Sequence, residues 1–77
     1  MAKVLFKGWR YGLEKISLTK LFQKRVNLSL REAKDRTDAL LNDKTFVIET
    51  ENSEQAKELV EEATAIGAVC EIIKDND

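Results

Sequence analysis

Side chains that commonly carry catalysis are scarce in this sequence. The 77 residues include no histidine, so neither a histidine-based triad nor a histidine metal site can form. The single cysteine, Cys70, lies in a predicted strand, where burial would make its thiol inert. Gly8 and Gly12 flank "WRY" and match no phosphate-binding loop. The residue types with the strongest catalytic record are therefore absent or isolated.

Carboxylates are numerous, but their spacing favours a solvated helix face over an acid–base pair. Glu58, Glu61 and Glu62 fall on the polar side of a predicted amphipathic helix. A catalytic pair of carboxylates needs a pocket that shifts its pKa values, and a chain this small rarely has one. We expect a protein that is not an enzyme and has no metal or cofactor.

Charge is divided unevenly along the chain. Residues 1–34 contain nine Lys or Arg and two Glu, whereas the remaining residues contain four basic and twelve acidic side chains. Such asymmetry points to a partner of opposite charge or to self-association. The alternative is a solvated surface whose two halves happen to differ.

The length and apolar pattern indicate a single small domain spanning residues 1–77, because a chain this short has no material for a second core. The longest apolar runs are far shorter than the roughly 20 residues of a membrane span. The N-terminus lacks the apolar middle section of a secretory signal. Together with the lone cysteine, these features predict a cytoplasmic protein.

Hydrophobic periodicity and turn residues predict six helices and strands and one turn. They are a strand at 3–7, a turn at 8–12, a helix from about 14 to 25, a helix from 30 to about 41, a strand at 44–50, a helix from 53 to 66 and a strand at 68–74. Ser29 and Glu32 form a capping box in which each side chain reaches the backbone amide of the other. Asn52 or Ser53 caps the third helix, and Gly67 ends it.

This order predicts an α+β two-layer sandwich, with a small three-stranded sheet covered on one face by the helices. Periodicity does not fix the order of the strands. The expected core comprises apolar stripes on the three helices: Leu18, Leu21 and Phe22, then Leu30, Ala33, Thr37, Leu40 and Leu41, then Ala56, Leu59, Val60, Ala63 and Ile66.

Several apolar side chains have two interpretations. With Leu18, Leu21 and Phe22 turned inward, Ile16 projects near Thr19, Lys20 and Gln23, where it could contact a partner or tuck under the "GWRY" turn. Trp9 and Tyr11 could anchor an interface or cover the end of the core.

Residues 15–35, "KISLTKLFQKRVNLSLREAKD", resemble the helix-turn-helix segment of the C-terminal domain of the bacterial large-subunit ribosomal stalk protein. "LSLREAKD" is close to that family's "LGLKEAKD", and "AKELVEEATAIGAVCEI" resembles its closing helix and strand. The resemblance implies the same element order, in a fold shared with the Clp protease adaptor. It also implies docking of translation GTPases through the first helix and the start of the second.

Carried over by position, the resemblance assigns Lys15, Ile16, Lys20 and Lys34 to that docking surface. Thr19 stands where the family has an exposed isoleucine, Gln23 where it has an arginine, and Lys24 where it has a glycine. The family also has an N-terminal dimerisation domain and a hinge. Because this chain begins with the first strand, we expect a relative of the domain and not a complete stalk protein.

The sequence thus predicts a non-catalytic protein-interaction module that docks an acidic surface, such as that of a translation GTPase or another ribosome-associated protein. The predicted partner-binding residues are Lys15, Ile16, Thr19, Lys20, Gln23, Lys24 and Lys34. Three alternatives remain: nucleic-acid binding with Trp9 and Tyr11 as stacking groups, a Clp-adaptor-like role, and salt-sensitive self-association of basic and acidic faces.

Overall fold

A computed structural model describes residues 2–73 of the chain. The elements follow in the order β1 (Ala2–Trp9), α1 (Lys15–Val26), α2 (Leu30–Leu41), β2 (Phe46–Thr50), α3 (Ser53–Ala65) and β3 (Ala68–Ile73). The predicted α+β class and element order are confirmed. The predicted extension of the last strand to Lys74 lies outside the described residues.

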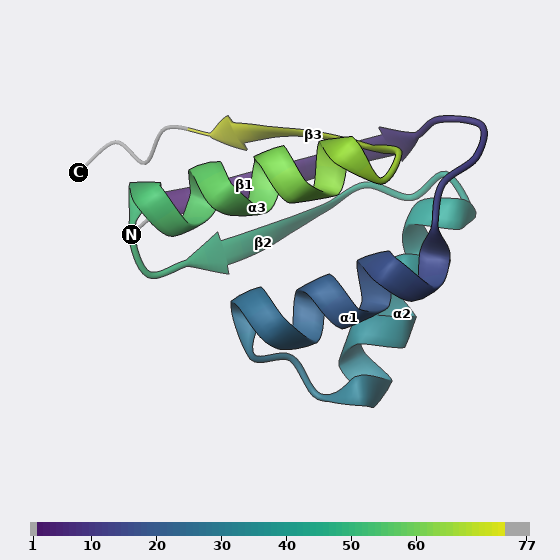
Figure 1. The fold of residues 1–77 in the computed structure, drawn as a ribbon, viewed down its shortest axis with the longest axis horizontal. Helices are drawn as coiled ribbons and strands as arrows, with labels where there is room; N and C mark the ends of the chain where they lie inside the picture. Colours follow the sequence, from purple (N-terminus) through teal and green to yellow (C-terminus); the bar gives the residue numbers. More distant parts are fainter. Residues whose placement is uncertain (1, 74–77) are drawn as a thin grey trace.

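The sheet has the strand order β2-β1-β3, and β1 pairs antiparallel with both neighbours. The connection through α3 carries the chain from one edge strand to the other, past the central β1. Helix α3 lies along the sheet, and α1 and α2 form a second group beside β2 (Figure 1). This arrangement buries one apolar face of the sheet against the helices and leaves the other face to solvent.

Strand β1 is longer than the sequence pattern predicts. Gly8 and Trp9, assigned to a turn above, pair with Val69 and Ala68 of β3. The register shifts between Phe6 and Gly8, as in a β-bulge, and an extra residue of this kind hides the alternation that marks a strand. The turn itself starts at Arg10, and α1 begins after it at Lys15.

The core forms around three phenylalanines from three different elements. The Phe6 ring lies 5.2 Å from Phe22 in an edge-on arrangement and 5.2 Å from Phe46 in a stacked one, measured between centroids. Leu18, Leu21 and Phe22 are buried, which confirms the predicted inner face of α1. Each pair of aromatic rings in such an arrangement contributes about 0.5–1.5 kcal/mol to stability beyond the burial of apolar area.

One predicted core residue is on the surface. Leu30 is 52% exposed, although it continues the stripe of Ala33, Thr37 and Leu40 along α2. It occupies the first position of α2, which lies beyond the edge of the core. Leu41, at the other end of the stripe, is half-buried.

Local caps fix the helix ends. The Glu32 amide donates to Ser29 Oγ over 3.1 Å, as predicted, but the Glu32 carboxylate accepts from the Ser29 hydroxyl and not from its amide. Asn52 caps α3, because its Oδ1 accepts from the Gln55 amide over 2.8 Å. Asn27 ends α1 in the left-handed conformation, with φ of 55°.

In the described part of the chain, none of the helices has the length and apolar character needed to cross a bilayer.

Candidate functional site: a groove between α1 and α2

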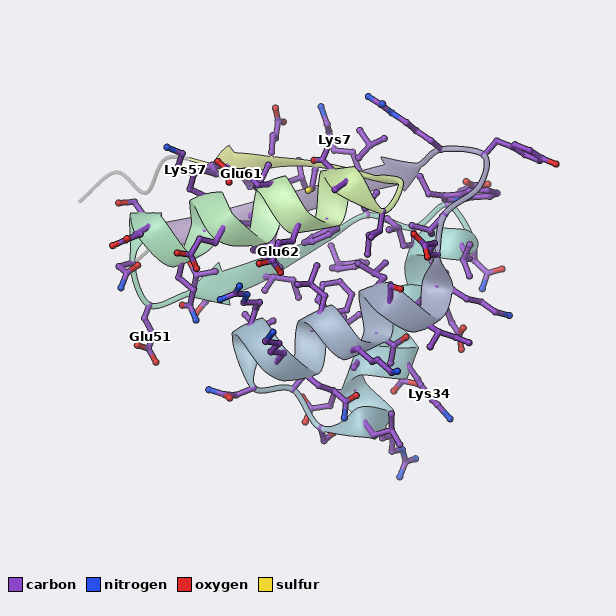
Figure 2. The ribbon with its side chains drawn as sticks, in the orientation of Figure 1. Lys7, Lys34, Glu51, Lys57, Glu61 and Glu62 are labelled. Atoms are coloured by element: carbon purple, nitrogen blue, oxygen red, sulfur yellow. The ribbon has the colours of Figure 1, made fainter. Side chains whose placement is uncertain are left out.

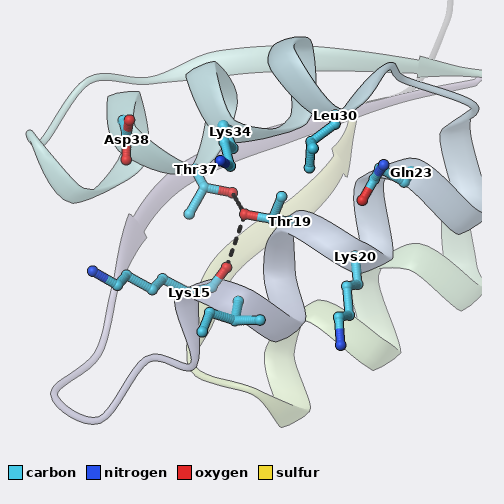
Figure 3. Close-up of a pocket in the computed structure, with 9 residues that line it drawn as sticks. Lys15, Thr19, Lys20, Gln23, Leu30, Lys34, Thr37 and Asp38 are labelled. Carbon is cyan, nitrogen blue, oxygen red and sulfur yellow. Dashed lines mark hydrogen bonds between the residues drawn. The ribbon is translucent and has the colours of Figure 1, made fainter.

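A pocket of about 300 Å³ lies between the first two helices (Figure 3). Helix α1 contributes Lys15, Ile16, Thr19, Lys20 and Gln23, and α2 contributes Leu30, Lys34, Thr37 and Asp38. These nine residues define what we call the α1–α2 groove. Six of the seven predicted partner-binding residues line it. Lys24, the seventh, lies outside it and lines a neighbouring hollow beside Lys20, Leu21 and Glu62.

A pair of threonine hydroxyls closes the floor of the groove. Thr19 Oγ1 lies 2.9 Å from Thr37 Oγ1, and each oxygen is also 3.0 Å from a carbonyl of its own helix, that of Lys15 or Ala33. Each hydroxyl has one proton, so one donates to the other and the second donates to its carbonyl. Thr37 is only 3% exposed, and this pair satisfies its hydroxyl while joining the helices.

Apolar side chains stand at opposite ends of the groove. Ile16, in the first turn of α1, is 67% exposed, and Leu30, which begins α2 and lies near Gln23 in Figure 3, is 52% exposed. The prediction that Ile16 projects from the surface is confirmed, and the alternative that it tucks under the preceding turn is wrong. Between these residues the wall is formed by lysine stems, which can cover apolar surface while the ammonium stays in water.

Lysine ammonium groups at the rim of the groove have no carboxylate partner among residues 2–73. The ion pairs in that part of the chain are Lys7 with Glu71, and Arg25 with Glu58 and Glu62. Asp38 is the one acidic side chain that lines the groove. In Figure 2, Glu51, Glu61 and Glu62 lie away from Lys34, whereas Lys7 and Lys57 lie on the same side of the molecule as Glu61.

Arg25 does not contribute a free charge to the groove, because its guanidinium is bonded to carboxylates of α3 and holds α1 against that helix. Its Nε donates to Glu62 Oε2 over 3.2 Å, its Nη2 donates to Glu62 Oε1, and its Nη1 donates to Glu58 Oε2 over 3.2 Å. The hydrogen bond and the charge of Glu62 raise the pKa of the Arg25 guanidinium. Glu58 and Glu62 are thus more than a solvated face, which corrects the interpretation of these carboxylates given above.

Gln55 supports the same contact from the other end of α3. Its Nε2 donates to the carbonyl of Arg25, in the last turn of α1, over 2.6 Å, and its Oε1 accepts from the Glu51 amide over 2.8 Å. The C-terminal end of α1 is therefore fixed by both a side-chain ion pair and a backbone hydrogen bond. This leaves the outer face of α1, which lines the groove, in a defined position.

No group of three or more Cys, Asp or Glu side chains within residues 2–73 is arranged to hold a metal ion. Cys70 is half-buried, and this burial raises the pKa of its thiol, although a hydrogen bond with Thr64 partly opposes the shift. A raised pKa disfavours the reactive thiolate.

The sequence pattern missed three residues that line the groove: Leu30, Thr37 and Asp38. With Lys34 they have the spacing i, i+4, i+7 and i+8, which places them along one face of α2. That spacing was a usable signal, but the apolar members were assigned to the core. Tyr11, which we considered as a cover for the core, is fully exposed, so that interpretation is wrong.

Comparisons with known protein families and with curated proteins found no match to this chain.

Proposed function

We propose that this chain is a non-catalytic protein-interaction module that docks an acidic partner surface in the α1–α2 groove. The strongest support is that the groove combines two exposed apolar side chains, Ile16 and Leu30, with lysines. Among the described residues, these lysines form no ion pair with a carboxylate. Complementary charge across an interface mainly speeds and orients the encounter. Ile16 and Leu30 supply apolar surface that a partner can desolvate after that encounter.

The resemblance to the ribosomal stalk C-terminal domain suggests a translation GTPase, or another ribosome-associated protein, as that partner. The family's exposed isoleucine is replaced by Thr19, whose hydroxyl is held by Thr37. Apolar contact therefore falls to Ile16 and Leu30, at the ends of the groove. A partner of this chain needs two apolar contact points with acidic residues between them.

Charge reversal tests the groove directly. Lys20→Glu combined with Lys34→Glu should abolish capture of the partner from a native lysate while the circular dichroism spectrum stays unchanged. The matched control is Lys44→Glu with Lys57→Glu, since this pair makes the same change in net charge at residues that do not line the groove. Unchanged capture by the groove variant, or equal loss in both variants, would discard this face.

A further inference from the structure

The last residue of β1 and the turn that follows it present three exposed side chains in sequence: Trp9, Arg10 and Tyr11. Tyr11 has a relative exposure of 103% and Trp9 one of 39%. Trp, Tyr and Arg are the residue types most enriched among those that dominate binding energy at protein interfaces. We call these three residues the aromatic tip. No hydrogen bond or ion pair within residues 2–73 involves their side chains.

The backbone under the aromatic tip is held in one conformation. The Leu13 amide donates to the Arg10 carbonyl over 3.1 Å, which closes a β-turn with Tyr11 and Gly12 at its centre. Gly12 has φ of +94° whereas Tyr11 does not have a positive φ, so the turn is of type II. Tyr11 at the first central position points away from the molecule.

Two further hydrogen bonds fasten this turn to the end of α3. The Arg10 amide donates to the Gly67 carbonyl over 2.7 Å, and the Glu14 amide donates to the Ile66 carbonyl over 3.0 Å. Leu13, between them, packs against the core. A partner that binds the tip has little backbone to order, and reduced ordering on binding increases affinity.

The groove alone is too small for a stable interface. A standard interface uses about 20–30 residues on each side, whereas nine residues line the groove. The contact must therefore extend beyond it. The aromatic tip is adjacent, because the turn leads directly into Lys15 and Ile16 at one end of the groove.

We propose that the aromatic tip is the main binding determinant of the interface, with Tyr11 inserted into an apolar pocket of the acidic protein that covers the groove. This rests on the proposed function. The pocket would offer a hydrogen-bond acceptor to the Tyr11 hydroxyl, and a carboxylate at its mouth would pair with Arg10. Single-stranded nucleic acid fits less well, because domains that bind it commonly have a basic net charge, whereas this chain has a formal net charge of -1.

The test measures the affinity of one purified partner for a series of variants. That partner is the protein that wild-type chain retains from a native lysate and that the Lys20→Glu/Lys34→Glu variant loses. Tyr11→Ala should raise its dissociation constant at least about 30-fold, and Tyr11→Phe by less than about 10-fold. Val47→Ala is the control, because Val47 is 43% exposed on a different element and should change the constant less than about 2-fold.

Four outcomes would overturn the proposal. If Tyr11→Ala binds as tightly as wild type, the role of the aromatic tip is refuted, while docking in the groove still stands. If the Lys20→Glu/Lys34→Glu variant captures the same proteins as wild type, the proposed docking in the groove is refuted. If wild type captures no protein, both the docking in the groove and the role of the tip are refuted. Binding of labelled poly(U) that Tyr11→Ala abolishes assigns the tip to nucleic acid. Independently of any partner, ¹⁵N relaxation should give order parameters near 0.85 at Tyr11 and Gly12, and values below about 0.6 would refute the fixed turn.

Discussion

Substitution of Gly67 by alanine probes the contact that fastens the aromatic tip to the rest of the domain. Gly67 has φ of +105°, and a Cβ built there would lie 2.9 Å from the Leu13 Cα and 3.3 Å from the Leu13 amide nitrogen. Both neighbours are backbone atoms, so no side chain can rotate to make room. The turn would have to move away from α3, weakening the bonds that Arg10 and Glu14 donate to it.

The expected loss of stability has two parts. A side chain at a positive φ costs about 1–2 kcal/mol, and a methyl group forced into a packed site costs about 1–3 kcal/mol. Alanine also restricts the unfolded chain, which returns about 0.4–1 kcal/mol. Gly67→Ala should therefore destabilise the domain by about 3 kcal/mol, the middle of the resulting range. For a domain of this size, that lowers the melting temperature by about 12–24 °C.

Gly12→Ala is the matched control, since Gly12 has φ of +94° but nothing lies within 4 Å of its Cβ position. It should show the backbone cost alone, about 1 kcal/mol after the same offset. Urea unfolding followed by circular dichroism measures both variants. If Gly67→Ala is no more destabilising than Gly12→Ala, the close approach of Leu13 to Gly67 is refuted.

The remaining predictions concern the core, a cap and the thiol. Phe22→Ala should cost about 3–5 kcal/mol in urea unfolding, because it leaves a cavity beside the stacked rings of Phe6 and Phe46, and a loss below about 1 kcal/mol would contradict the buried cluster. Ser29→Ala should cost about 1 kcal/mol through loss of the α2 cap, and an unchanged unfolding midpoint would argue against that bond. Burial raises the pKa of Cys70, so the contribution of this thiol is fully present below its unfolded pKa of about 8.5 and is lost as pH rises through the folded value. The melting temperature of wild type relative to Cys70→Ala should accordingly fall from pH 7 to pH 9.5, and a constant difference would show that the thiol is not desolvated.

Local pattern was sufficient to predict the elements of this fold. The stripe of Leu18, Leu21 and Phe22 has helical spacing and is buried, because a helix that packs on a sheet must bury one continuous face. The order β2-β1-β3 was beyond such reasoning, since periodicity indicates which face of a strand is buried but not which strands pair. The bulge after Phe6 was hidden for a related reason, because it interrupts the alternation.

The candidate site could be predicted from spacing on α1, whereas on α2 only Lys34 was predicted, through the resemblance. At about 100° per residue, Lys15, Thr19, Gln23, Ile16 and Lys20 span an arc of about 140° on one side of α1, and all line the groove. Lys24 falls about 40° beyond Lys20 and lines the next hollow. The position of Leu30 depends on where α2 crosses α1, which is a tertiary property that the spacing within one helix does not contain.

The central claim is that a partner binds in the α1–α2 groove, and titration of the ¹⁵N-labelled chain with the captured partner tests it most directly. The account predicts that the largest amide shift changes fall within residues 15–23 and 30–38, and that they shrink as salt is raised. Changes confined to α3 and the open face of the sheet, with residues 15–23 unaffected, would contradict it.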